Sequence, residues 1–522
     1  MDSPTIRRTG LLLSAHPFNS NFSKSKKEMQ TTTKYIAQLF LAGMVCMVSC
    51  KKLDLTPTSQ LSTTIFWKTA GDADLALTGL YNTLYANNGT VDQNAPYWWD
   101  CFSDNAYSQH SMGGSQNALI AGLTPTSGNY QLLYYQNGYV AIAACNSFLA
   151  NVGKVLSGDA LNRYKGEAFF LRGFNYFWLA QLYGNVPIVT ADPMTISYQS
   201  KMAKSPRADV LKRAEADLDS AIAYLPDTKY TTGHAVKAAA EGFQIRLYLF
   251  EQRFAEAAAM AQKIISGGLF TLNSNYPSNF YKPDQKSSPE IIFSVEYQAP
   301  AVPHPYSLNV LLIGPGWKDC QGTQDMINEY EAGDPRKTMT FFFPGDGTAQ
   351  GWPYPGTVGT PGVSEWVIGF YPTKKGVDPT VTNPVPGLLD DQDYVLLRYA
   401  DIELMYAEAQ NEAVGPDASV YQQVNAVRAR PGVNMAPLPA GLSQADMRQK
   451  IRHERRVELA LEGLRYYDLR RWGIATQKLN GFVQNPTTPS VTTLYKDIYE
   501  YWPLPQTEID RNTPTLVQND GY

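Results

Sequence analysis

Residues 234–266 read HAVKAAAEGFQIRLYLFEQRFAEAAAMAQKIIS. The apolar periodicity predicts two helices separated by a short break at Glu251-Gln252-Arg253. Small side chains let antiparallel helices approach closely, and each helix carries three at suitable positions: Ala235, Ala239 and Gly242, then Ala257, Ala258 and Ala261. A helix pair of this kind is the unit of a tetratricopeptide repeat, so we expect a scaffold of stacked helical hairpins.

Helical patterns continue on both sides of this hairpin. The pattern before Gly184-Asn185-Val186-Pro187 stops there, as glycine followed by proline is a typical helix end. The sequence therefore predicts a mainly α fold with further helices at 72–86, 159–183, 205–224, 398–412, 417–430 and 443–467. Acidic and basic residues alternate over 448–472 at three- and four-residue spacing, which indicates structural ion pairs.

Between residues 270 and 396 the helical periodicity is lost. Proline, glycine, tyrosine and tryptophan accumulate there, and only short strand-like runs occur, such as 291–295. A loop-rich segment of this length is usually functional. We therefore expect a helical region over 71–269, a loop-rich binding insert over 270–396, and a C-terminal helical region over 397–522.

The composition excludes some classes of function. The 522 residues carry a net charge of −4 and no long basic block, whereas a nucleic-acid-binding protein usually shows a basic face. The five cysteines form no C-x-x-C pair, so no zinc knuckle or redox motif is expected. If Cys46 is removed with an N-terminal signal segment and Cys50 is acylated, three cysteines remain unmodified: one disulfide and a buried thiol, or three buried thiols, fit equally well.

The N-terminal region resembles a lipoprotein signal peptide. An apolar run over 35–48, too short to span about 30 Å of hydrocarbon, ends just before Ser49-Cys50. We expect residues 1–28 to be a non-native extension, 29–49 the signal peptide, and 50–70 an anchor and linker. Lipid on Cys50 would hold the protein at a membrane.

No catalytic motif is evident. The sequence contains no P-loop, no dinucleotide-binding glycine motif after a strand, and no G-x-S-x-G elbow. The acidic residues stand in no recognisable glycosidase pattern. We therefore expect a protein that is not an enzyme and has no cofactor or metal site, although the sequence neither requires nor excludes a bound calcium ion. A surface glycan-degrading enzyme and a protein-interaction scaffold are the alternatives.

Four blocks of sequence, in this order, resemble the SusD/RagB family of nutrient-binding outer-membrane lipoproteins. They are residues 163–187, residues 397–430, residues 454–473, and the end of the chain from Tyr501-Trp502-Pro503 to Gly521-Tyr522. The resemblance implies a tetratricopeptide-like scaffold that supports an irregular binding region. It also implies a lipid-anchored protein of the outer membrane that is exposed at the cell surface. Such a protein binds an oligosaccharide or similar nutrient without catalysis and partners a SusC-like TonB-dependent transporter.

Sugar binding favours an aromatic ring against the C–H face of a pyranose, with amides and carboxylates reaching its hydroxyls. Two regions offer this mixture: residues 97–105 and the loop around Trp317. The resemblance implies that both regions contribute aromatic residues to the glycan site. The candidate ligand-binding residues are Tyr97, Trp98, Trp99, Asp100, Asn105, Tyr297 and Trp317, with Trp98 and Trp317 favoured; Trp352, Tyr354 and Trp366 are weaker candidates. The loop composition is compatible with starch, xylan, host glycans or a peptide nutrient.

Overall fold

A computed structural model describes residues 66–85, 94–108, 110–120, 122–127, 130–197, 200–313, 319–343, 370–378, 381, 387–485 and 491–522. The predicted lipidation site Cys50, the expected extension and the expected signal peptide lie outside these residues. From Trp67 to Tyr522 the chain forms one compact unit. Within the described part of the chain, no helix combines the length and the apolar character needed to cross a membrane.

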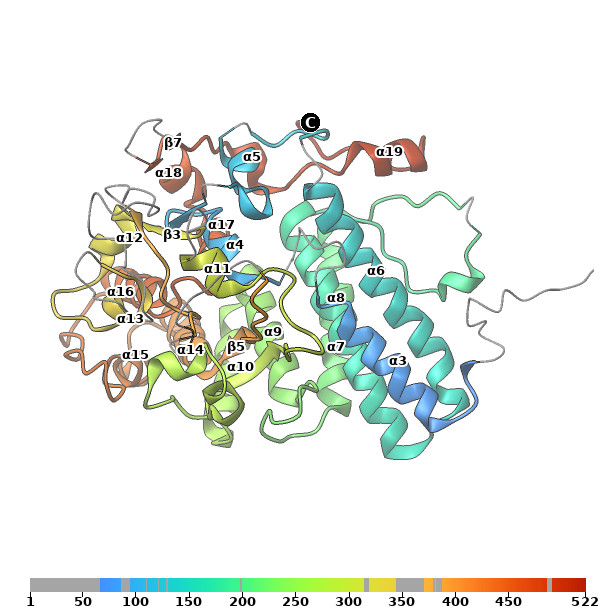
Figure 1. The fold of residues 1–522 in the computed structure, drawn as a ribbon, viewed down its shortest axis with the longest axis horizontal. Coiled ribbons are helices and arrows are strands. Elements are labelled where there is room, and N and C mark those ends of the chain that lie inside the picture. The colour runs from blue at the N-terminus through green and yellow to red at the C-terminus, as the bar shows by residue number, and fades with distance from the viewer. Residues whose placement is uncertain are drawn as a thin grey trace, which may run out of the picture. The chain divides into compact units, whose positions relative to one another are not determined.

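Paired helices form the scaffold, and helices that are neighbours in the chain pack side by side (Figure 1). The array comprises α6 (Tyr130–Asn151), α7 (Gly158–Tyr183), α8 (Arg207–Tyr224), α9 (Lys237–Phe250), α10 (Phe254–Gly267), α14 (Tyr399–Ala413), α15 (Ala418–Arg428) and α16 (Gln444–Glu458). Helix α10 packs against α14, so the array continues across the irregular segment between them. The predicted mainly helical, tetratricopeptide-like class is confirmed.

The small residues of the 234–266 hairpin are buried as predicted, but Gly242 does not face the partner helix. Ala239, Ala257 and Ala261 are fully buried in α9 and α10. Gly242 instead faces strand β5 (Tyr394–Arg398), because a Cβ atom added to it would lie 2.2 Å from Leu397 Cδ2. This glycine therefore allows the strand, rather than the partner helix, to approach α9.

Short strands and helices make up the irregular region. The predicted strand at 291–295 is β2 (Ile291–Val295), which pairs antiparallel with β5. A second sheet has the order β1 (Ala106–Tyr107), β3 (Gln321–Thr323) and β4 (Phe370–Tyr371). Short helices surround these strands: α4 (Pro96–Asp100), α5 (Ser115–Leu119), α11 (Leu308–Ile313), α12 (Gln324–Glu329) and α13 (Arg336–Thr340).

The C-terminal segment differs from the prediction. The expected helix over 443–467 ends at Glu458, and the chain turns before α17 (Arg465–Arg471). Leu461 and Gly463 have φ angles of +63° and +76°, and this left-handed backbone is incompatible with a continuous right-handed helix. The chain ends with α18 (Ala475–Leu479), the β6–β7 hairpin (Val483–Asn485 and Val491–Thr492) and α19 (Gln506–Asn512).

We expect Gly463→Ala to destabilise the protein by about 1–3 kcal/mol. The substitution forces a Cβ atom into left-handed backbone and places it 3.0 Å from Pro96 Cα and from the Pro96 carbonyl oxygen, both backbone atoms that cannot move aside easily. Urea unfolding measures the loss. Gly481→Ala, also at positive φ but with no atom within 4 Å of the added Cβ, separates the cost of the backbone from that of the clash.

Candidate functional site

The sheet β1–β3–β4 brings together the two regions in which ligand-binding residues were predicted. Ala106 pairs with Gly322 and Tyr107 with Gln321, so the segment after Trp98 lies beside the segment that follows Trp317. Trp317 itself lies outside the described residues, as do Trp352, Tyr354 and Trp366. The junction of the two segments is the candidate functional site (Figure 1).

A polar cluster joins the two segments at the end of the sheet. The Ser108 hydroxyl donates to Asp319 Oδ1 at 2.9 Å, and the His110 backbone N–H donates to the same oxygen at 3.1 Å. His110 Nδ1 lies 2.9 Å from Asp319 Oδ2. Burial raises the pKa of the Asp319 carboxyl, and the interactions with His110 and Ser108 oppose this shift. The carboxylate thus ties the described segment that begins at Asp319 to Ser108 and His110.

Exposed polar and aromatic groups surround this cluster. The His110 side chain is 42% exposed, and Tyr107 and Ser111 are half-buried. We call Tyr107, His110 and Ser111 the His110 surface. A ring hydroxyl, an imidazole and an alcohol can together exchange hydrogen bonds with a polyol. Sequence reasoning missed these residues, since none stands in a recognisable motif.

The four described aromatic candidates are core residues, which corrects the expectation that they present ring faces to a ligand. Tyr97, Trp98, Trp99 and Tyr297 are only 2–5% exposed. Trp98 lies beneath the Met112–Gly114 turn, where a Cβ on Gly113 would come within 3.1 Å of Trp98 Cβ. A sugar could not lie against these rings unless the core opened.

The other two candidates, Asp100 and Asn105, belong to a buried hydrogen-bond network and are corrected in the same way. Both are at most 1% exposed. Asp100 accepts bonds from Asn105 Nδ2 and from the Gly463 backbone N–H, each at 2.6 Å. Arg456 Nε donates to Asn105 Oδ1 at 2.9 Å. Burial raises the pKa of Asp100 to about 6. These residues attach α4 to the C-terminal helices beneath the candidate site.

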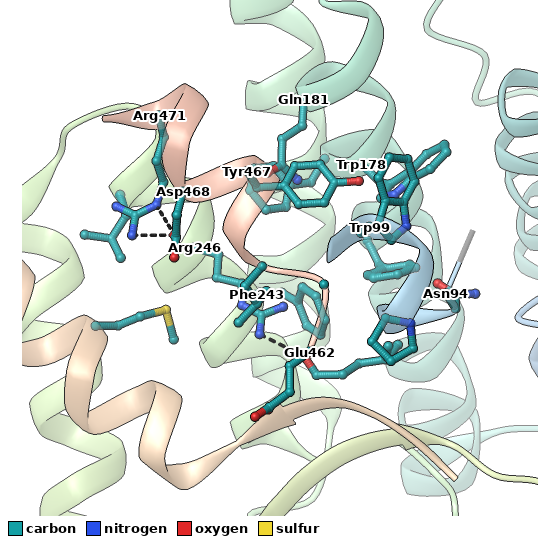
Figure 2. Close-up of a pocket in the computed structure, with 18 of the residues that line it drawn as sticks. Asn94, Trp99, Trp178, Gln181, Phe243, Arg246, Glu462, Tyr467, Asp468 and Arg471 are labelled. Carbon is teal, nitrogen blue, oxygen red and sulfur yellow. Dashed lines mark hydrogen bonds and ion pairs between the residues drawn. The ribbon is translucent and has the colours of Figure 1, made fainter. Parts of the chain in front are cut away.

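A separate cavity of about 100 Å³ lies among α4, α7, α9 and α17 (Figure 2). Trp99, Trp178 and Tyr467 line one side, and Arg246 and Asp468 lie on the other. Carboxylates already neutralise the arginines of its wall: Arg246 Nη2 donates to Asp401 Oδ2 at 2.8 Å, for example. Each arginine among the described lining residues, Arg246, Arg455 and Arg471, is therefore paired with a carboxylate.

A buried network of charges links the irregular region to α16. Glu458, on α16, accepts hydrogen bonds from Arg336 Nη1, Arg398 Nη1 and Arg430 Nη2 at 2.9, 2.8 and 2.7 Å. All four side chains are at most 1% exposed. This confirms the prediction of structural ion pairs in the charged C-terminal helix.

Among the residues that the structure describes, no group of three or more potential ligand side chains is placed to hold a metal ion.

Two family models match the chain: the SusD family over residues 269–522, and a family described as starch-binding and associating with the outer membrane over residues 52–249. SusD-like protein P2 of Formosa agariphila is 24% identical to this chain, and the alignment covers 92% of this chain and 99% of the Formosa protein.

Solved structures show the same fold. A SusD-like carbohydrate-binding protein from Bacteroides fragilis superposes with a TM-score of 0.74 at 24% identity, over 85% of this chain and 99% of its own. A laminarin-binding SusD-like protein gives a TM-score of 0.69 at 24% identity, over 87% of this chain and 100% of its own.

Proposed function

Because this chain belongs to the SusD family, we propose that it is a non-catalytic glycan-binding protein of the outer membrane. In this proposal lipid on Cys50 anchors it at the cell surface, and it delivers an oligosaccharide or similar nutrient to a SusC-like TonB-dependent transporter. Solved relatives described as carbohydrate-binding and laminarin-binding support the class of ligand.

The observation that carries the site is the contact between the two predicted regions. Asp319, which follows Trp317 by two residues in the sequence, binds His110 of the His110 surface. We place the glycan against the His110 surface and the Trp317 ring. The buried residues Trp98, Trp99 and Asp100 then act as support beneath the site rather than as ligand contacts.

Calorimetry with a panel of soluble glycans, including laminarin and starch oligosaccharides, tests the ligand class. We expect saturable binding to at least one glycan and no new reducing ends after prolonged incubation. Turnover of the bound glycan would contradict the non-catalytic role. Membrane fractionation of cells that express Cys50→Ala or Cys46→Ala tests the anchor. We expect Cys50→Ala to release the protein from the membrane fraction and Cys46→Ala to leave it there.

We expect Trp317→Ala to weaken binding of that glycan by about 1–3 kcal/mol, roughly 5- to 150-fold in Kd, because a stacked ring is lost. His110→Ala should have a smaller effect in the same direction. Tyr224→Ala is the control, since Tyr224 is a 40% exposed ring on α8, outside the candidate site. An unchanged Kd for Trp317→Ala would refute this site assignment.

A further inference from the structure

Two buried cysteines, Cys101 and Cys320, lie near each other beneath the candidate site. Cys101 directly follows α4, and Cys320 directly precedes β3. The Cys320 thiol donates to the Tyr97 carbonyl oxygen, with Sγ 3.1 Å from that oxygen, and Cys101 stands one helical turn after Tyr97. The two thiols are close enough for each to influence the pKa of the other. Both residues are at most 1% exposed.

The backbone holds Cys320 in an unusual conformation at this contact. Its φ angle is +58°, in the left-handed region that residues other than glycine seldom occupy. The Thr373 hydroxyl donates to the Cys320 carbonyl oxygen, and β3 pairs with strands on both sides immediately afterwards. Strained conformations of this kind persist where the surrounding structure fixes them. Here the surroundings fix the side chain of Cys320 against the Tyr97 carbonyl, at the end of α4 where Cys101 lies.

We propose that Cys101 and Cys320 are joined by a disulfide in the exported protein, which leaves Cys145 as a buried free thiol. The proposal rests on the outer-membrane location in the proposed function, because disulfides form in oxidising compartments outside the cytoplasm. Cys101, Cys145 and Cys320 are all free thiols in this structure. Cys145 lies on α6, and the charged groups that act on its thiol are those of Arg172 and Asp217.

The bond forms by thiol–disulfide exchange. One cysteine, as a thiolate, attacks a disulfide of an oxidant, which is an oxidoreductase or a small-molecule disulfide, and releases one thiol of that oxidant. The second cysteine then displaces the other thiol, so that two protons and two electrons pass to the oxidant. Burial raises the pKa of both thiols in the folded protein, and the exchange must therefore occur before this region is buried.

The disulfide would fasten α4 to β3 independently of the sheet. Cys320 is next to Asp319, which holds the His110 surface, and three residues after Trp317. A covalent link at this point would keep the two segments of the candidate site in register even when the short β1–β3 pairing opens.

The test counts thiols in protein isolated from the outer membrane of cells that express the full chain. The protein is denatured in an alkylating reagent, digested without reduction and analysed by mass spectrometry. We expect a Cys101 peptide linked to a Cys320 peptide, with Cys145 alkylated. Alkylation of all three cysteines, or a link that involves Cys145, would overturn the proposal.

Refolding of the reduced chain in a buffer of oxidised and reduced glutathione is the second arm, and it does not depend on export. The same linkage is expected, and reduction should then lower the Tm by about 3–6 °C. Cys320→Ser should abolish this redox-dependent shift, whereas Cys145→Ser should keep it. Three free thiols in a membrane-bound sample that still binds glycan would refute the disulfide alone, and loss of glycan binding or membrane association with the linkage intact would refute the proposed function alone.

Discussion

Glu458→Ala is expected to lower the free energy of unfolding by about 5 kcal/mol, the upper end of the cost of breaking a buried ion pair. The carboxylate serves three arginines at once, with N–O distances of 2.9, 2.8 and 2.7 Å to Arg336, Arg398 and Arg430. Without Glu458 the three arginines keep their charges but lose a shared carboxylate partner. Solvent cannot replace it, because all four side chains are at most 1% exposed. Urea unfolding followed by circular dichroism measures the loss.

A matched surface pair provides the control. Glu412 pairs with Arg448 at 2.6 Å, but the Arg448 side chain is 31% exposed. Glu412→Ala should therefore cost less than about 1 kcal/mol. Equal losses for the two variants would show that the buried network does not stabilise the junction of α16 with the irregular region. If Glu458→Ala fails to fold, Glu458→Gln, which keeps the shape of the side chain, provides the measurable variant.

The pKa of Glu458 determines how its contribution to stability changes with pH. Burial alone would raise the pKa of Glu458, but the charges of Arg430, Arg398 and Arg336 outweigh burial and hold it well below its usual value of 4.5. The contribution of Glu458 to stability is therefore complete above pH 4.5 and is lost as the pH falls toward the folded-state pKa. Wild-type protein should lose stability on acidification below that value more steeply than Glu458→Gln does.

The sequence predicted those features that depend on local periodicity. The break at Glu251-Gln252-Arg253 separates α9 from α10, since the apolar pattern on each side is that of an amphipathic helix. The charge alternation over 448–472 indicated ion pairs correctly, but the charges of α16 pair with other elements, and Asp468–Arg471 is the pair at three-residue spacing that is described in this range. The identity of the partners, such as Arg336 for Glu458, depends on contacts between distant segments and could not be predicted.

The candidate site shows where sequence reasoning fails. Tyr97-Trp98-Trp99-Asp100 has the composition of a sugar-binding surface, yet all four side chains are buried. Burial there is decided by distant elements: the Met112–Gly114 turn covers Trp98, and the Gly463 N–H binds Asp100. An amphipathic ring with neighbouring carboxylates suits a satisfied core as well as a surface, so composition alone could not distinguish the two.

Glu403→Gln is expected to stabilise the protein by about 3–5 kcal/mol at pH 8.5 and to have little effect at pH 4.5. Glu403, on α14, is 4% exposed, and its Oε2 atom has no hydrogen-bond partner among the described residues. Burial, followed by the charge of Glu290, raises its pKa from 4.5 to about 8. The folded protein therefore favours the neutral carboxyl, which a glutamine amide resembles in shape and charge.

The contribution of Glu403 to stability changes with pH in the opposite direction to that of Glu458. A carboxyl whose folded-state pKa is raised contributes its full stability below the unfolded value, and this contribution declines as the pH rises from 4.5 to about 8. Urea unfolding of both proteins at intervals across this range measures the difference, which should widen steadily with pH for Glu403→Gln. Parallel curves would mean that the fold accommodates an ionised Glu403, with Arg430 and Arg398 compensating for its burial. A widening gap would instead show that these two arginines are already committed to Glu290 and Glu458, the carboxylates that they contact directly.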